Sequence, residues 1–260
     1  MAKKKIKDRE ERFNKFGSVM ILEKYRASND IDIFFPEYNY TVEHVQYYSF
    51  KEGIIKCPYE PRVYGKGFLG EGPYKSKANN KDVEAYKIWY DMLKRCYDLK
   101  YQEKRPTYIG CEVCDEWLNY QNFAKWYSKN YYEVLDQRME LDKDILLKGN
   151  KVYSPDNCIF VPHVINSLFI KCDTVRGEYP VGITLNKRDN KLQARCRVYE
   201  NGKMIRKHLG YFNVDQVEEA FFVYKTVKES NIKTVADQYR ELIPKKLYNA
   251  LYEYEVEWED

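Results

Sequence analysis

Residues 140–166, with the sequence ELDKDILLKGNKVYSPDNCIFVPHVIN, carry acidic and amide side chains in an unusual order. Asp142 and Asp144 lie on a short apolar run, Leu141 to Leu147, as in a strand with polar residues at its end. The pair Gly149-Asn150 predicts a turn, because both residue types tolerate the backbone angles of tight turns. The first half of this stretch is therefore expected to be a strand followed by a turn.

The second half begins with Ser154-Pro155-Asp156-Asn157, which predicts a turn leading into a helix. Proline fixes its own φ, and aspartate and asparagine side chains can accept hydrogen bonds from unpaired backbone N–H groups. Asn166 follows nine residues after Asn157, on the next segment. Two strands and a helix that close on one point would bring Asp142, Asn157 and Asn166 together.

This order of residues resembles the H-N-H (ββα-metal, His-Me finger) endonucleases, in the form found in phage-encoded homing enzymes. Leu141-Asp142-Lys143-Asp144 matches the first element of their pattern, Ser154-Pro155-Asp156-Asn157-Cys158 the second, and Asn166 the third. The resemblance implies one divalent cation, Mg²⁺ or another, held by Asp142 and Asn166, with Asn157 holding the loop and orienting the base. A hard cation prefers oxygen ligands and stabilises charge on a scissile phosphate.

One position departs from the pattern of that family. The family's general base is a histidine directly after the first-strand ligand, and Lys143 stands there instead. A lysine side chain is protonated at neutral pH, so it is a poor base. His163 lies within the motif and is the alternative base, although a lone histidine is more often an ordinary polar residue. Two interpretations stay open: a nuclease with an unusual base, and a ββα scaffold that binds DNA without cutting it.

The charge of the chain is unevenly placed. The formal net charge is +4, but residues 253–260 carry five acidic side chains and no basic one, which leaves +9 on the rest. A basic body fits a polyanion such as double-stranded DNA. No run approaches the ~18 apolar residues that span a membrane. With seven cysteines and no signal peptide, the sequence predicts a reduced, cytoplasmic protein, and the phage resemblance implies a bacterial host cytoplasm.

The first 80 residues predict three segments. Residues 1–16 form a charge-rich arm, for which a solvated end is favoured over a phosphate contact. Residues 17–57 alternate β-favouring runs with turn residues, which predicts a small β unit of three or four strands. Residues 58–80 are rich in glycine, proline and lysine, so they are expected to be a linker, with a clamp on a DNA strand as the alternative.

Residues 81–175 are expected to form the nuclease-like module. Within residues 82–98, apolar side chains recur at helical spacing, which predicts a helix with one face in a core. A second helix is expected around residues 122–129. The order of tryptophan, cysteine and aromatic residues from about residue 85 onward also resembles what precedes the nuclease motif in those phage proteins.

Cys111 and Cys114 form a Cys-x-x-Cys pair inside this module, and this spacing raises the hypothesis of a structural zinc site. A closed zinc site needs a second pair of ligands. The candidates are isolated cysteines, Cys96, Cys158 and Cys172. Small buried thiols in a core are the favoured interpretation.

Residues 176–232 predict a three-stranded antiparallel sheet with one helix. Apolar and polar residues alternate in residues 181–186 and 192–199, and Asn201-Gly202 between β-favouring runs is a strong hairpin signal. A third strand is expected at about residues 205–211, and a helix after Asp215. The apolar face of the sheet would pack on that helix and leave a polar face exposed.

This region resembles the ethylene-response (APETALA-type) DNA-binding domain. The resemblance rests on Val181-Gly182-Ile183, an arginine-bearing middle strand, Leu209-Gly210-Tyr211-Phe212, and the helix with Glu219-Ala220. In that family the sheet lies in the major groove, where forked arginine donors suit base edges and phosphates. The residues that the resemblance implies as DNA contacts are Arg188, Gln193, Arg195, Arg197, Arg206 and Lys207. The alternative is an ordinary solvated sheet face.

Residues 233–260 predict a helical tail that packs on the body or on another subunit and ends in an acidic, solvated segment. The whole chain is thus expected to be an α+β protein with a small N-terminal β unit, a central ββα-metal (H-N-H-like) module, and a C-terminal three-stranded antiparallel sheet plus helix. The expected function is a site-specific, metal-dependent DNA endonuclease of the homing class. The alternative is a catalytically inactive DNA-binding or regulatory protein derived from one. A third class is an inhibitor of another protein, and the sequence leaves protein partners and oligomeric state open.

Overall fold

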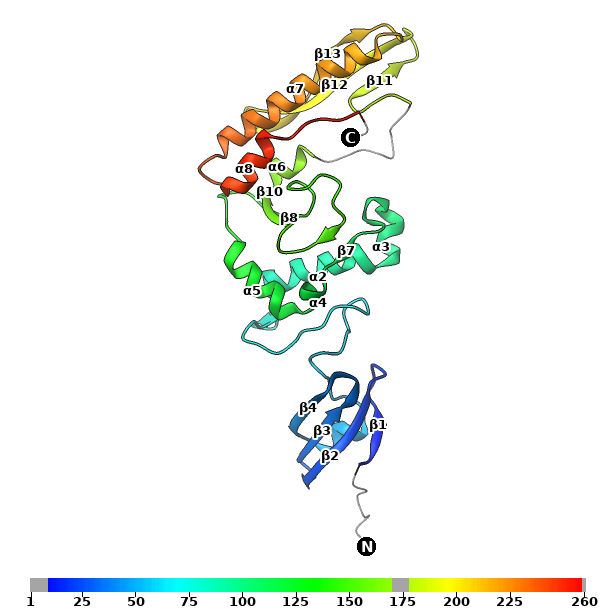
Figure 1. Cartoon of the computed structure of the whole chain (residues 1–260), viewed down its shortest axis with the longest axis vertical. Helices are drawn as coiled ribbons and strands as arrows, with labels where there is room; N and C mark the ends of the chain where they lie inside the picture. Colours follow the sequence, from blue (N-terminus) through cyan, green and yellow to red (C-terminus); the bar gives the residue numbers. More distant parts are fainter. Residues whose placement is uncertain (1–8, 170–177, 259–260) are drawn as a thin grey trace. The chain divides into compact units, whose positions relative to one another are not determined.

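The computed structural model describes residues 9–169 and 178–258 of the 260-residue chain. These residues form two compact units, one running up to Lys129 with Lys151–Pro155 added, the other formed by Asn130–Asn150 and the chain from Asp156 onward. Both contain helices and mainly antiparallel sheets, which confirms the α+β class (Figure 1). The expected nuclease-like module, residues 81–175, is therefore divided between the two units.

The first unit begins with the expected small β unit. Four antiparallel strands lie in chain order: β1 (Glu11–Phe13), β2 (Val19–Ala27), β3 (Asp30–Phe35) and β4 (Tyr40–Val45). A short 3-10 turn (Pro36–Tyr38) joins β3 to β4, and the helix α1 (Tyr47–Lys51) follows β4. Side chains from β2, β3 and α1 form one core, with Met20, Ile31 and Phe50 fully buried.

The expected linker is tied to the helices that follow it. The backbone N–H of Phe68 donates to Leu118 O, and that of Tyr120 donates to Phe68 O, each at 2.9 Å. The Gln121 side chain donates to Tyr74 O at 2.9 Å. A two-stranded ribbon, β5 (Lys77–Ala78) with β6 (Lys81–Asp82), closes the segment. Within the first unit, residues 58–80 therefore pack as an ordered segment rather than run as a free linker.

The helices of the first unit pack around tryptophans. The expected amphipathic helix is confirmed as α2 (Glu84–Tyr97), and the second as α5 (Tyr120–Asn130). Trp89 of α2 is fully buried and donates its indole N–H to Trp117 O at 2.7 Å. The remaining elements are α3 (Leu99–Lys104), a 3-10 turn (Pro106–Tyr108), α4 (Asp115–Leu118), and β7 (Glu112–Val113), which pairs in parallel with β9 (Val152–Tyr153).

The second unit contains a strand pair followed by a short helix. Strand β8 (Met139–Asp142) pairs antiparallel with β10 (Ile159–Pro162), and α6 (His163–Ser167) follows directly. The turn at residues 155–157 leads into β10, so the expectation of a helix directly after it is wrong. The apolar residues after the turn bury themselves by pairing with β8, and this burial outweighs the helix-start signal of the turn.

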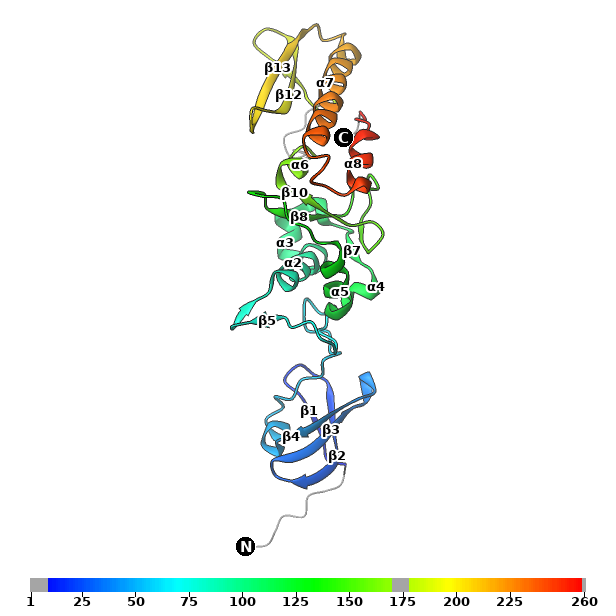
Figure 2. The same ribbon diagram turned by 90° about the vertical axis from the view of Figure 1, so that its left-hand side faces the viewer.

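The C-terminal sheet and helix appear as expected. Strands β11 (Ile183–Asn186), β12 (Lys191–Glu200) and β13 (Lys203–Phe212) form an antiparallel sheet in chain order. Glu200 pairs with Lys203 across the two-residue Asn201-Gly202 turn, where both residues have positive φ. Helix α7 (Val217–Gln238) lies along the sheet, as both ribbon views show (Figures 1 and 2).

Helix α7 belongs to two cores at once. Its first half packs Ala220 and Tyr224 against the sheet, and its second half packs Ile232 and Val235 with residues of β10 and α6. The expected boundary between residues 232 and 233 thus falls inside a continuous helix. This 22-residue helix packs against both the sheet and the β8–β10–α6 segment.

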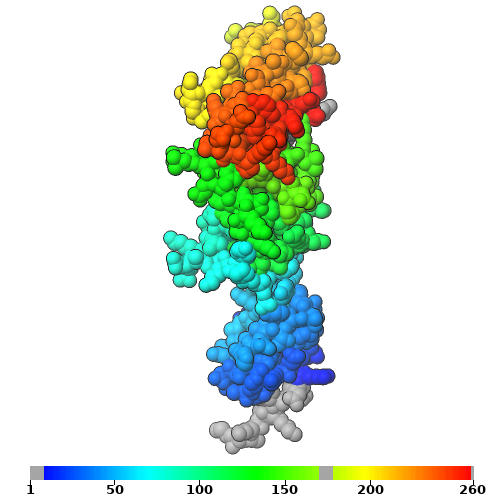
Figure 3. Space-filling model, turned by 60° about the vertical axis from the view of Figure 1, so that its left-hand side comes forward, coloured from blue at the N-terminus to red at the C-terminus, as the bar shows by residue number. Residues whose placement is uncertain are grey.

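The tail folds back on the second unit, as predicted. Helix α8 (Lys245–Tyr252) buries Leu247 and Leu251 in the core shared with α7. In the space-filling view the C-terminal segment, in red, lies against the orange end of α7 (Figure 3). The acidic side chains of Glu253, Glu255 and Glu257 are exposed, as expected, whereas Val256 between them is only 3% exposed and its carbonyl accepts from Lys225 at 2.8 Å. None of the helices in the described ranges combines the length and apolarity needed to cross a membrane.

Gly182 is the position where the sheet meets α7 most tightly. Its φ is +82°, and a Cβ there would lie 2.2 Å from the Tyr224 ring. We expect Gly182→Ala to lower the free energy of unfolding by about 2–4 kcal/mol, because it adds both backbone strain and a clash. Gly202→Ala is the matched control, since its φ is +78° but no atom lies within 4 Å of the added Cβ. Equal losses for the two variants in urea unfolding would contradict a contribution from the Tyr224 contact.

Candidate nucleic-acid interface

The sheet face that points away from α7 carries the predicted arginines. In the β12–β13 register, Arg197 pairs with Arg206, and Arg195 pairs with His208. Leu192, Ala194 and Cys196, which alternate with these arginines along β12, are buried on the α7 side. Side chains of directly paired strand residues share one face. The structure therefore brings Arg195, Arg197 and Arg206 together.

These three guanidinium groups have no acidic partner within the described part of the chain. No ion pair or hydrogen bond there involves the guanidinium groups of Arg195, Arg197 or Arg206, and all three residues are exposed. Like charges placed directly opposite on neighbouring strands destabilise a sheet. The Arg197–Arg206 pair is therefore unfavourable for folding alone, and an anion bound on this face would relieve the repulsion.

Two of the other predicted DNA contacts lie differently. Lys207 pairs in register with Cys196, so it belongs to the α7 side of the sheet, and its Nζ lies 3.1 Å from Glu200 Oε1. Lys207 is therefore not part of the arginine face, although it is exposed. Arg188 lies in the turn between β11 and β12, with its side chain 89% exposed and 3.1 Å from Asp189 Oδ1. It can contact a partner only beyond the end of the sheet.

Gln193 lies on the expected face but is not free to contact a partner. It is only 8% exposed, and its Nε2 lies 3.1 Å from His208 Nδ1 and 3.5 Å from Tyr211 Oη. The rings of His208 and Tyr211 pack with centroids 4.7 Å apart. The exposed polar groups at this end of the face are therefore His208 and Tyr211, with Gln193 beneath them.

Simple alternation would have placed His208 and Tyr211 on opposite faces, because they are three residues apart. The β12–β13 register shifts between Ala194 and Arg195, where Ala194 pairs with Gly210 and Arg195 with His208. This β-bulge inserts an extra residue in β13 and brings both rings to the arginine face. The sequence signal for this irregularity is the glycine at position 210, inside the strand. In the structure Gly210 has a φ of +146°.

In the β8–β10–α6 segment, polar side chains converge on Glu140 rather than on Asp142. His163 Nδ1 lies 2.8 Å from Glu140 Oε1, and the Asn166 amide donates to Glu140 Oε2. Arg138 also donates to this carboxylate. Burial alone would raise the pKa of Glu140, but hydrogen bonds from Arg138, His163 and Asn166 outweigh burial and hold it below its usual value. Glu140 was not among the residues singled out from the sequence, because it lies outside the family pattern.

The Asp142 side chain accepts hydrogen bonds from the backbone of the turn that follows it. Its Oδ1 accepts the backbone N–H groups of Asp144 at 2.9 Å and Ile145 at 2.7 Å. Burial, and after it the charge of Asp144, raises the pKa of Asp142 to about 6. The Asn166 amide meets Glu140 instead, so the expected metal ligands Asp142 and Asn166 have different partners here. This arrangement does not fit a cation held by that pair.

Lys143, at the position of the family's base, lies inside the loop. Its side chain is buried, and its Nζ donates to Asn150 O at 2.8 Å and contacts Asp144 Oδ2 at 3.0 Å. Asn150 donates back to Lys143 O at 2.6 Å, and Asn157 Nδ2 lies 3.4 Å from Asn150 Oδ1. The lysine thus closes the loop between β8 and β9, and Asn157 contacts that same loop through Asn150.

The Cys-x-x-Cys pair does not form a metal cluster in the described residues. Cys111 is buried and Cys114 is half-buried, and no third histidine, cysteine or acidic side chain there completes a site with them. Cys172, one of the candidate further ligands, lies outside the described residues. The buried Cys111 and the half-buried Cys114 agree with a packing role, and burial raises the pKa of the Cys114 thiol.

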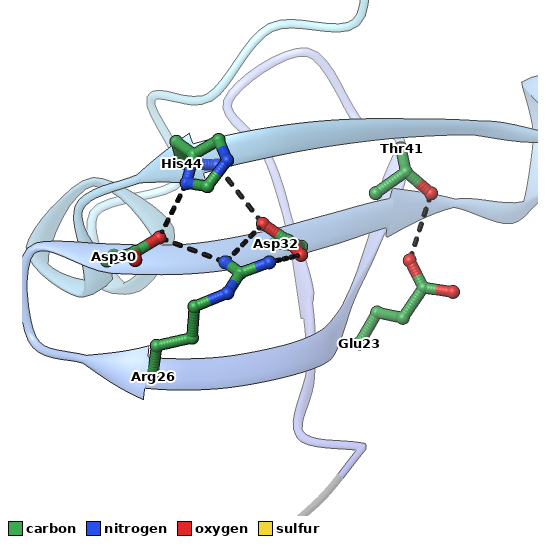
Figure 4. A network of polar contacts seen from close by, with 6 residues as sticks. All are labelled: Glu23, Arg26, Asp30, Asp32, Thr41 and His44. Carbon is green, nitrogen blue, oxygen red and sulfur yellow. Dashed lines mark hydrogen bonds and ion pairs between the residues drawn. The ribbon is translucent and has the colours of Figure 1, made fainter.

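Within the described ranges, one group has metal-ligand types and spacing: Asp30, Asp32 and His44 in the N-terminal sheet. Figure 4 shows that the Arg26 guanidinium already lies among them. Arg26 Nη1 donates to Asp30 at 2.9 Å and to Asp32 at 2.8 Å, and His44 Nδ1 lies 2.9 Å from Asp30. A cation would have to displace this guanidinium, so the group is a salt-bridge network that joins β2, β3 and β4.

This network should make the N-terminal sheet sensitive to acid. The hydrogen bond from Arg26 lowers the pKa of Asp32 from its ordinary 3.8 to about 2. A lowered pKa contributes stability above about pH 4 that is lost as the pH falls toward 2. We expect Arg26→Met to lower the melting temperature by roughly 3–5 °C at pH 7 and by clearly less at pH 2, where about half of the Asp32 carboxyls are protonated.

The control for this prediction is Arg12→Met, which removes a partly exposed arginine of β1 that pairs with its near neighbour Glu10 and lies 5.7 Å from the centre of the Phe50 ring. Its effect on melting should be small at both pH values, because exposed ion pairs contribute little. A pH-independent loss in Arg26→Met, measured by circular dichroism, would show that packing rather than the ion pair carries the effect.

Comparison of the chain with protein-family models, with curated proteins and with solved structures found no match. The assignments above therefore rest on the residues and on the geometry of this chain.

Proposed function

We propose that this protein binds double-stranded DNA through the exposed face of β12 and β13. The observation that carries the proposal is the cluster of Arg195, Arg197 and Arg206, three guanidinium groups without an acidic partner in the described residues. An antiparallel ribbon fits the major groove, and arginine forks match both guanine edges and phosphates. A polyanion also explains why the unfavourable Arg197–Arg206 pairing is present on an otherwise well-packed sheet.

The direct test is a titration of a labelled duplex of random sequence with the full-length protein, followed by fluorescence anisotropy. Three phosphate or base contacts from arginine predict that the logarithm of affinity falls with the logarithm of salt with a slope of about −3. Absence of binding at 50 mM salt would contradict the proposal. The same result would favour the third class, in which the protein binds another protein.

A second candidate function is metal-dependent cleavage of the bound DNA. It is favoured by the β8–β10–α6 order and by the convergence of His163 and Asn166 on Glu140. A carboxylate and an amide oxygen are suitable ligands for Mg²⁺, Mn²⁺ or a related divalent ion. Such an ion would stabilise charge on a scissile phosphate. Within the protein, Asn157 and Lys143 hold the neighbouring loop, and His163 is the histidine in position to move a proton.

The rival to this second function is a ββα scaffold that binds DNA without cutting it. The buried Lys143 favours the rival, because the position of the family's base is occupied by a loop-closing contact. Incubation of supercoiled plasmid with the protein and Mg²⁺ or Mn²⁺ separates the two. Nicked or linear product supports cleavage, and unchanged plasmid together with a gel shift supports binding alone. We further propose that the protein acts in a bacterial cytoplasm, on the basis of its odd number of cysteines and the phage resemblance.

A further inference from the structure

Two exposed phenylalanine rings lie at the edge of the N-terminal sheet. Phe13, the last residue of β1, is 70% exposed, and Phe16, in the loop between β1 and β2, is 50% exposed. The backbone N–H of Lys15 donates to Gly53 O at 2.8 Å, so this loop lies against the chain that follows α1. Ile54, the next residue there, is exposed as well. Exposed apolar side chains that lie together indicate an interaction site, whereas scattered ones do not.

Cationic side chains lie beside these rings. Lys56 Nζ is 5.8 Å and Arg62 Cζ is 5.3 Å from the centre of the Phe16 ring. Lys15, the residue before Phe16, is exposed. Three apolar and three cationic residues thus form one surface, which we call the Phe16 surface: Phe13, Lys15, Phe16, Ile54, Lys56 and Arg62.

Buried polar side chains hold the loop of the Phe16 surface in place. Asn14 is 5% exposed, and its Oδ1 accepts the backbone N–H groups of Phe16 at 3.0 Å and Ser18 at 2.9 Å. Its Nδ2 donates to Glu60 Oε1 at 2.8 Å, and the other oxygen of the buried Glu60 lies 3.6 Å from Arg62 Nε. Burying polar groups costs free energy, and here the buried groups order a loop that exposes apolar rings to water. Departures of this kind from what folding alone favours are expected at functional sites.

The combination of rings and cations fits one class of ligand. Aromatic rings stack on unpaired bases, and lysine and arginine side chains attract the phosphates between them. A protein partner fits less well, because lysine is depleted from the cores of protein interfaces. We infer that the Phe16 surface binds single-stranded nucleic acid. The inference does not depend on the arginine face of β12 and β13, since all six residues of the Phe16 surface belong to the first unit.

The test is a titration of a labelled thymidine strand of about 12 nucleotides, followed by fluorescence anisotropy. The full-length protein carries Arg195→Ala and Arg197→Ala in every sample, so that the arginine face contributes little. Addition of Phe13→Ala and Phe16→Ala should lower affinity for the strand by about tenfold or more, because base stacking is lost. The slope of log affinity against log salt should not change, because no charge is removed.

Lysine variants test the phosphate contacts separately. Addition of Lys15→Ala and Lys56→Ala, in place of the phenylalanine substitutions, should make the salt slope less negative by about 1.4, since each contact to a single strand contributes about 0.7. The matched control for the rings is Phe222→Ala, which removes a 68% exposed phenylalanine from α7 in the second unit. Its affinity for the strand should stay within about twofold of the parent.

A leucine pair distinguishes stacking from general apolar contact. Phe13→Leu with Phe16→Leu keeps an apolar surface of similar size but removes the rings, so affinity should fall as in the alanine pair. Tyrosine at both positions should retain affinity, because the ring remains. Circular dichroism checks the fold of each variant, and the leucine pair carries the test if the alanine pair is destabilised.

The outcomes separate this inference from the proposed duplex binding. No binding of the strand at 50 mM salt, or equal affinity with and without the two phenylalanines, overturns the inference, and duplex binding by the wild type would then still stand. Full affinity in the leucine pair also overturns it and favours a protein partner. Strand binding that depends on the rings supports it even where duplex does not bind. A uridine strand is the second arm: both strands offer base faces and phosphates, so both should bind, and the tighter one identifies DNA or RNA as the source.

Discussion

Replacement of both Arg195 and Arg197 by alanine is expected to weaken duplex binding by about 30- to 100-fold near 100 mM salt. Each arginine that contacts a phosphate or base releases condensed counterions, so its loss lowers affinity and flattens the salt dependence. The slope of log affinity against log salt should become less negative by about 1.8, since each lost contact removes about 0.9. Fluorescence anisotropy at four salt concentrations between 50 and 200 mM measures both quantities. Folding should be preserved or improved, because the variant removes the Arg197–Arg206 repulsion.

The control is the double variant Lys203→Ala, Lys207→Ala. It removes the same formal charge from β13, but both lysines pair with residues on the α7 side of the sheet. If binding depends on the arginine face, this control should lose less than about threefold in affinity. Equal losses in the two double variants would mean that net charge alone attracts DNA, and would contradict the assignment of the interface to that face.

In the plasmid assay, Glu140→Gln is expected to reduce cleavage by about 100-fold or more, while leaving DNA binding unchanged. The side chains of His163 and Asn166 both contact Glu140. Even substitutions of groups that only orient metal ligands lower metal affinity or activity 10- to 100-fold. Asp136→Asn is the matched control, because Asp136 is exposed, precedes β8, and has a φ of +59° that asparagine also tolerates. It should cleave as the wild type does.

Asp142→Asn separates two locations for the cation. The asparagine oxygen can still accept from Asp144 and Ile145, so the turn should remain folded. If the cation binds at Glu140, the variant should keep at least half of the cleavage rate. If Asp142→Asn lost cleavage and Glu140→Gln retained it, the cation would be assigned to Asp142 and Asn166, the pair that the family resemblance implies. Absence of cleavage in the wild type with both metal ions would leave a DNA-binding protein with Lys143 as a structural residue.

Local patterns in the sequence predict much of this fold. The helical spacing of Ala85, Trp89 and Leu93 predicts α2, and the Asn201-Gly202 turn predicts the β12–β13 hairpin. These elements depend on interactions between residues close in the chain, so a short stretch of sequence is enough to predict each of them. The exposed arginines of β12 follow for the same reason, since alternation assigns the two faces of a regular strand.

What only the tertiary structure decided depends on residues far apart in the chain. The β-bulge opposite Ala194 put Tyr211 beside His208, with Gln193 buried beneath them. The register of β8 against β10 and the position of α6 made Glu140, not Asp142, the partner of His163 and Asn166. Helix α7 joined two cores that the sequence pattern suggested were separate, because a 22-residue helix can bury one apolar stripe against different neighbours at its two ends. By itself the sequence therefore determined which elements form and which strand residues face outward, whereas register and burial between distant segments decided which side chains meet.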